Sequence, residues 1–66
     1  MEVTLYKTCG DIEWYQIEEN EFEGFNKKSE SWQYVLYKDE CKLWILIGCG
    51  KATSSEDVDE LMNMVS

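Results

Sequence analysis

The sequence predicts an α+β domain, namely a four-stranded antiparallel β-meander with one C-terminal α-helix packed on one face of the sheet (ββββα). Two observations lead to this fold class. Several short stretches alternate apolar and polar side chains with the two-residue period of a β-strand. Near the C-terminus the period lengthens to 3.6 residues, which is typical of an amphipathic helix. With 66 residues in all, we expect one small domain that spans 1–66.

Four stretches are predicted to be strands, at 2–7, 12–18, 31–38 and 43–48. The first two form a hairpin whose turn contains Gly10, because glycine readily adopts the positive φ of tight turns. Asp39 and Glu40 mark the tip of a second hairpin. The last stretch, Leu43-Trp44-Ile45-Leu46-Ile47-Gly48, has no polar interruption before its glycine and is expected to be buried on both faces.

The alternation stops over 19–31, where glutamates crowd around Phe22 and Phe25, and we expect a long loop there. A helix is predicted after Gly50. Its apolar residues fall at i, i+3, i+4 and i+7 and therefore share one helix face. They are Val58, Leu61, Met62 and Val65. Ser54 is the expected N-cap, with an acidic residue three positions later.

A helix with four apolar residues covers one face of a small sheet and leaves the other uncovered. On the central strand, Leu43, Ile45 and Ile47 share one face, and Trp44 and Leu46 share the other. We expect the aliphatic set to meet the helix and Trp44 to point outward among other aromatic residues. Such a patch marks an interaction surface, unless the sheet coils enough to bury its own aromatics.

Acidic residues outnumber basic ones by 14 to 6, so the formal net charge is −8, and the sequence contains no arginine. A field of this sign repels nucleic acid and anionic membranes and attracts basic proteins. The expected partner is therefore a basic protein, with no direct nucleic-acid or membrane contact. The apolar run is too short to span a bilayer and the first residues lack the pattern of a signal peptide, so a cytoplasmic location is expected.

The surface itself is the candidate site. Acidic side chains would steer a basic partner, and aromatic side chains would supply affinity. The candidate partner-binding residues are Trp14, Glu18, Glu19, Glu21, Phe22, Glu23, Phe25, Trp32, Asp39, Glu40 and Trp44. In composition the chain is similar to DNA-mimic inhibitors and to small acidic immunity proteins that block a toxic nuclease. The leading hypothesis is therefore an inhibitor that binds a basic, nucleic-acid-handling protein. The alternative is a homodimeric architectural or regulatory subunit whose charge only serves solubility.

One segment has the spacing of an EF-hand calcium loop. Glu19, Glu21, Glu23, Gly24 and Glu30 would occupy positions 1, 3, 5, 6 and 12. Glutamate is one methylene longer than the Asp or Asn needed at the crowded early positions, and the flanks resemble strands rather than helices. A solvated acidic loop is the preferred interpretation, and no metal site is predicted.

Other site classes have less support. The segment 48–53 (GCGKAT) lies between a strand and a helix, but Ala52 stands where a phosphate loop needs a hydroxyl. With no histidine and no arginine, no nucleophile and base pairing is suggested. We therefore expect neither an enzyme nor a bound cofactor.

The sequence holds three cysteines, too few for the dense disulfide framework of a small secreted domain. Cys41 and Cys49 would lie at opposite ends of one strand, too far apart to bridge. In a four-stranded meander, Cys9 and Cys41 lie at the same end and are the one pair that could form a disulfide. Free thiols are expected. A third class of function, a calcium or redox switch, would depend on the EF-hand spacing or on Cys9 and Cys41.

Overall fold

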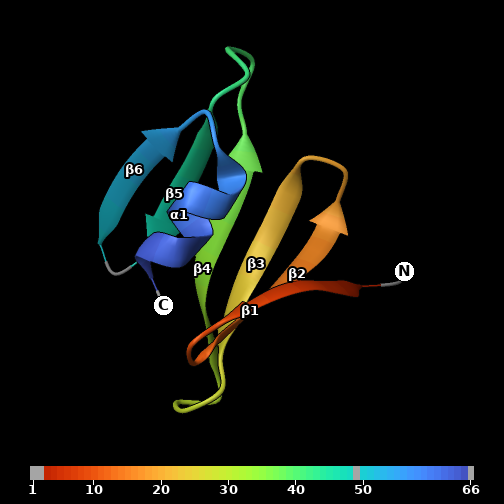
Figure 1. Cartoon of the computed structure of the whole chain (residues 1–66), viewed down its shortest axis with the longest axis vertical. Coiled ribbons are helices and arrows are strands. Elements are labelled where there is room, and N and C mark those ends of the chain that lie inside the picture. The colour runs from red at the N-terminus through yellow and green to blue at the C-terminus, as the bar shows by residue number, and fades with distance from the viewer. Residues whose placement is uncertain (1–2, 49, 66) are drawn as a thin grey trace.

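The computed structural model describes residues 3–48 and 50–65 and shows an antiparallel sheet followed by one helix (Figure 1). The α+β class is confirmed, but the sheet has six strands rather than four, in the order β1-β2-β3-β4-β5-β6. The elements are β1 Thr4–Cys9, β2 Ile12–Glu18, β3 Glu21–Asn26, β4 Ser31–Lys38, β5 Trp44–Gly48, β6 Lys51–Ser55 and α1 Val58–Met64. As expected, Gly10 turns β1 into β2 with a positive φ of 59°.

The predicted loop over 19–31 is wrong, because it contains β3. Phe22 and Gly24 are buried while Glu21 and Glu23 are less so, which is the alternation of a strand with one face against the core. Gly24 is closely packed there, since an added Cβ would lie 3.0 Å from Cβ of Tyr34. The sequence concealed this alternation, because glycine fills one core-facing position and the apolar Phe25 lies on the opposite face.

The second missed strand is β6, which pairs with β5 along its whole length. Its residues are mostly small and polar, so they give no apolar alternation. Ser54 belongs to this strand, and the helix begins later than predicted. Asp57 is the N-cap, and its carboxylate accepts a hydrogen bond from the backbone N–H of Asp59 at 3.0 Å.

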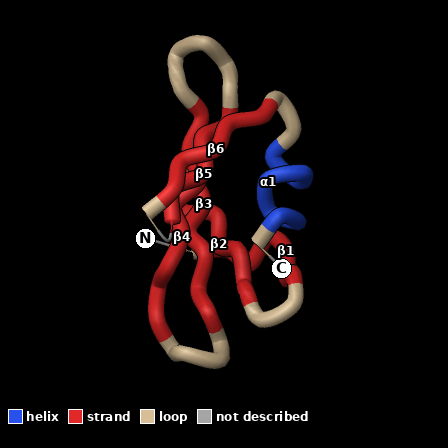
Figure 2. The backbone as a smooth tube through the Cα atoms, turned by 90° about the vertical axis from the view of Figure 1, so that its left-hand side faces the viewer, coloured by secondary structure: helices blue, strands red, loops and turns tan. Residues whose placement is uncertain are grey.

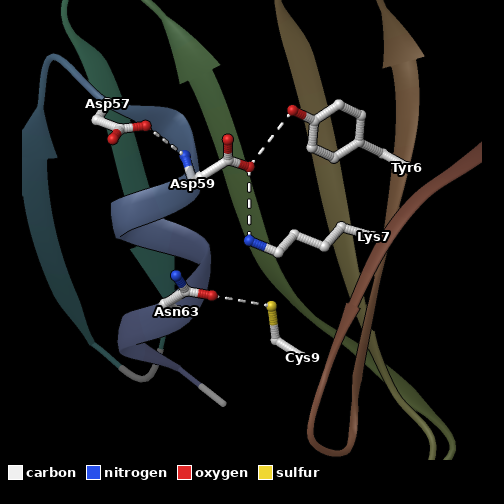
Figure 3. Close-up of polar contacts among 6 residues, drawn as sticks. All are labelled: Tyr6, Lys7, Cys9, Asp57, Asp59 and Asn63. Carbon is white, nitrogen blue, oxygen red and sulfur yellow. Dashed lines mark hydrogen bonds and ion pairs between the residues drawn. The ribbon is translucent and has the colours of Figure 1, made fainter.

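The helix lies on one side of the sheet, and the sheet curls towards it (Figure 2). In chain order α1 follows the last strand and packs on β5 and β6. Its other side reaches the first strand, where the Asp59 carboxylate lies 3.6 Å from the Lys7 ammonium (Figure 3). The Cys9 thiol donates a hydrogen bond to the Asn63 side-chain oxygen at 3.4 Å. The helix therefore links the two ends of the strand order.

The core fills the space between α1 and the sheet. Its buried residues come from six of the seven elements, and α1 contributes two of the four helix positions predicted to be apolar. They are Cys9, Ile12, Trp14, Phe22, Leu36, Leu46, Leu61 and Met62. Val58 and Val65 pack against this core. The sheet face that carries these residues is called the helix face here, and the opposite one the outer face.

The predicted assignment of the two faces of β5 is reversed. Leu46 is buried and Trp44 packs against the core, whereas Ile47 is 44% exposed. A two-residue period shows which residues share a face but not which face meets the helix. Both faces of this strand are apolar, so the sequence left the choice undetermined, and the expectation that aliphatic residues meet α1 was wrong.

The extra strand β3 also changes the position of the cysteines. Because successive strands are antiparallel, inserting one strand places the ends of β1 and β4 at opposite ends of the sheet (Figure 1). Cys9 and Cys41 therefore cannot form the disulfide that a four-stranded meander allowed. Both are free, with Cys9 buried and Cys41 exposed, while Cys49 lies outside the described residues.

Candidate functional site

The outer face of the sheet is the surface that α1 leaves uncovered. Directly paired residues of antiparallel strands point to the same face, so the register identifies its members. One row crosses four strands in succession, with the pairs Tyr15 to Glu23, Glu23 to Val35 and Val35 to Ile47. Val35 is 38% exposed and Ile47 is 44% exposed. Apolar side chains thus meet solvent in the middle of the sheet.

Three aromatic residues form a cluster at one end of this row. Trp32 lies edge to face with Phe25, with ring centroids 5.0 Å apart, and with Tyr15, with centroids 5.6 Å apart. Trp32 is nevertheless 54% exposed. Stacking of this kind fixes the ring positions, since offset edge contacts are favourable. We call Tyr15, Phe25 and Trp32 the outer aromatic cluster.

Carboxylates stand directly beside these rings. Glu13 pairs with Phe25, and Glu23 pairs with Tyr15 on the same face. Glu21 pairs with Tyr37 in the next row of the outer face. The Tyr15 hydroxyl donates a hydrogen bond to Glu13 at 3.2 Å. Partial desolvation raises the pKa of Tyr15, and the neighbouring Glu13 charge and this hydrogen bond raise it further.

The strand lysines whose side chains are described lie on the helix face. Lys7 forms its ion pair with Asp59 of α1. The Lys38 ammonium lies 5.8 Å from the centre of the Trp44 ring, in a cation–π contact. Neither Lys7 nor Lys38 therefore balances the negative charge that the outer face carries among its apolar residues.

Of the eleven predicted site residues, seven lie on the two faces of the sheet. Glu21, Glu23, Phe25 and Trp32 come together on the outer face. Trp14 and Phe22 are buried in the core, so no partner reaches them in this conformation. Trp44 packs against the same core instead of pointing outward.

The remaining predicted residues lie at one end of the sheet. Glu18 and Glu19 come where β2 turns into β3, and Asp39 and Glu40 come where β4 turns towards β5. A backbone hydrogen bond of 3.0 Å from Lys38 to Asn20 joins the two connections. The two connections that carry these four carboxylates thus meet at the same end of the sheet, although they are about twenty residues apart along the chain.

Sequence reasoning missed several outer-face residues. Tyr15, Glu13, Val35 and Ile47 were not among the predicted contacts, although their alternation with buried neighbours was visible in the sequence. The signal that could have found them is the two-residue period itself. Once Trp14 and Leu36 are assigned to the core, Tyr15 and Val35 must point the other way.

The arrangement gives no support for the calcium loop. Glu21 and Glu23 are strand residues that point to one face, whereas an EF-hand needs its early ligands to converge from a tight loop. Within 3–48 and 50–65, no group of three or more potential ligand side chains is placed to hold a metal ion. Across the same residues, no helix is long and apolar enough to cross a membrane.

Comparisons with protein-family models, with curated proteins and with solved structures found no match for this chain.

Proposed function

We propose that this protein is a non-enzymatic inhibitor that binds a basic, nucleic-acid-handling protein through its outer face. One observation carries the proposal, namely that carboxylates and aromatic rings lie side by side on the uncovered face, where Glu23 faces Tyr15, Glu21 faces Tyr37, and Trp32 is 54% exposed. Aromatic residues dominate the energetics of protein interfaces, and charged residues around them accelerate and orient the encounter.

The net charge supports the same partner class. With a formal charge of −8, the protein is attracted over long range to a surface rich in lysine and arginine. Proteins that handle nucleic acid carry such a surface, because they must neutralise phosphates. The four carboxylates at the end of the sheet, Glu18, Glu19, Asp39 and Glu40, extend the negative surface beyond the outer face.

Two forms of inhibition are compatible with this surface. A mimic occupies the nucleic-acid groove of its target and competes directly with DNA or RNA. An immunity-type inhibitor binds beside the active site and blocks it without competing. The row of apolar residues through Val35 and Ile47 favours a packed interface in addition to charge contacts, because each of these side chains is substantially exposed.

The experiment compares two charge-reversed variants of equal net charge. The outer-face variant is Glu21→Lys with Glu23→Lys, and the control is Glu56→Lys with Glu60→Lys, near the start of α1. Both should keep the far-UV circular dichroism of the unmodified protein. The tagged protein and each variant are used to recover the partner from host lysate. We expect the control to retain the partner and the outer-face variant to lose it.

The recovered complex is then challenged with duplex DNA and with salt. Release by DNA identifies a mimic, and inhibition without release identifies binding beside the active site. Weakening as ionic strength rises is expected in both cases, because steering by exposed charges is screened. Equal losses in the two variants, or a partner without a basic surface, would contradict the proposal.

The exposed aliphatic residues of the outer face also suit a second candidate, a homodimeric architectural or regulatory subunit. Leu5 joins Val35 and Ile47 among the exposed apolar side chains, and its register partner Tyr15 lies on the outer face. In that case self-association should be insensitive to salt, and sedimentation equilibrium should show a dimer in the absence of any partner.

A further inference from the structure

The outer aromatic cluster has a specific chemistry that a general acidic surface lacks. Two of its three rings face a carboxylate directly across the strand ladder, Phe25 facing Glu13 and Tyr15 facing Glu23. Side chains in such pairs have Cβ atoms about 4.5–5.5 Å apart. Each carboxylate therefore lies beside a ring on the same face, and Trp32 stacks against both of those rings.

From this arrangement we infer that the outer aromatic cluster, with Glu13 and Glu23, binds an arginine side chain of the partner. The inference rests on the proposed function and names the group that the surface recognises. Guanidinium is planar, stacks on aromatic faces and pairs with carboxylates through two parallel hydrogen bonds. Trp32 supplies the best ring for a cation, and 54% of this residue is open to solvent.

The positions of the carboxylates favour arginine over a neutral group. The Glu13 side chain is held in place by the Tyr15 hydroxyl at 3.2 Å, so little side-chain freedom is lost when it accepts a further hydrogen bond. The site also favours arginine over lysine. The planar guanidinium can stack on a ring and pair with a carboxylate at the same time, which the compact ammonium of lysine does less effectively.

A second copy of this chain is a poor occupant of the site. The chain contains no arginine, and of its six lysines the two strand residues Lys7 and Lys38 already contact groups on the helix face. Two outer faces packed together would bring the glutamates of one copy towards those of the other, and like charges in contact are unfavourable. Charge complementarity therefore points to a partner with an exposed arginine flanked by apolar residues that cover Val35 and Ile47.

The test uses short peptides as probes and the three tryptophans as reporters. The probe is a terminally blocked Val-Arg-Val peptide, and its control replaces arginine with citrulline, which has nearly the same shape but no charge. Indole N–H signals are followed by nitrogen-15 NMR during titration. We expect the Trp32 signal to shift with the arginine peptide, while the signals of buried Trp14 and core-packed Trp44 stay in place.

Two conservative variants test the carboxylates. Glu13→Gln and Glu23→Gln should each weaken binding of the arginine peptide by about fivefold, the scale of one exposed charge contact. Glu56→Gln is the matched control, because its residue is exposed and lies outside the sheet. Trp32→Phe should weaken binding less than Trp32→Ala, because phenylalanine keeps an aromatic face for the cation.

The outcomes separate this inference from the proposed function. Equal Trp32 shifts with arginine and citrulline, or equal effects of Glu23→Gln and Glu56→Gln, would overturn the arginine site. If the outer-face charge reversal still releases the partner from the recovered complex, the proposed function stands and only the arginine site is lost. A Trp32 shift that depends on protein concentration without peptide would also overturn it, because a second copy would then fill the site.

Discussion

The two faces of the sheet are built from neighbouring residues of the same strands, yet only one of them is covered. Leu36 on the helix face is fully buried, and the adjacent Val35 on the outer face is 38% exposed. Trp14 is fully buried, whereas Trp32 is 54% exposed. The comparison shows that apolar content does not separate core from surface in this chain. What separates them is the position of one short helix.

The largest expected effect is the difference in unfolding free energy between truncating Leu36 and truncating its neighbour Val35. Leu36→Ala should cost about 2–5 kcal/mol of unfolding free energy, because it leaves a cavity between α1 and the sheet. That is most of the stability of a domain this small. Val35→Ala should cost less than about 1 kcal/mol, because its side chain already meets solvent. Urea denaturation followed by circular dichroism measures both values.

Equal losses from these two substitutions would break the comparison. They would mean that the outer face is also covered in solution, as in the homodimer. The dilution dependence of the urea midpoint then distinguishes the cases, since a dimer loses stability on dilution and a monomer does not.

A second prediction concerns added rather than removed volume. A Cβ placed on Gly48 would overlap the Tyr34 ring and lie 3.0 Å from the Gln33 carbonyl oxygen. Gly48→Ala should therefore cost about 1–3 kcal/mol, as overpacking does elsewhere. On the outer face, Ala52→Val should change the free energy of unfolding by less than about 0.5 kcal/mol, because Ala52 is exposed beside Ile47.

A double substitution shows which group causes the loss of stability in Gly48→Ala. If the Tyr34 ring is the obstacle, Gly48→Ala should cost less in a Tyr34→Ala background than alone, so the two effects are not additive. Additive costs would instead place the strain in the backbone near Gln33.

Much of the fold was predictable, for physical reasons that also explain the failures. The strands at 12–18 and 31–38 carry strong alternation, and the helix residues Leu61 and Met62 are buried as their spacing indicated. β6 was missed because its residues are small and polar. It is held by pairing with β5, a tertiary effect that single-strand patterns do not report.

The candidate site was partly predictable in the same sense. Phe25, Trp32, Glu21 and Glu23 were selected by type, and the structure places them on one face. Trp14 was selected by the same criterion and lies in the core. Residue type alone cannot distinguish a core residue from an outer-face residue. The face that meets the helix is decided by the number and curl of the strands, and β3 was not recognised in the sequence.

The smallest expected effect compares one tyrosine from each side of the sheet. On the helix side, Tyr6 donates a hydrogen bond to Asp59 at 3.4 Å (Figure 3). Desolvation raises the pKa of Tyr6 above its ordinary value of 10.0, and the Asp59 charge and hydrogen bond raise it further. Asp59→Asn should therefore lower the pKa of Tyr6 only part of the way, since the desolvation remains.

The outer-face counterpart is Glu13→Gln, which should lower the pKa of Tyr15 and leave that of Tyr6 unchanged. Carbon-13 labelling of the tyrosine rings resolves the two titrations by NMR. A tyrosine whose pKa is higher in the folded protein than in the unfolded chain stabilises the fold. This contribution is present below about pH 10 and is lost as the pH rises through the pKa of the folded protein. Both substitutions should thus reduce the loss of stability in alkaline solution. If either one moves both pKa values equally, the two faces are electrostatically coupled through the sheet, and the separation between them does not hold.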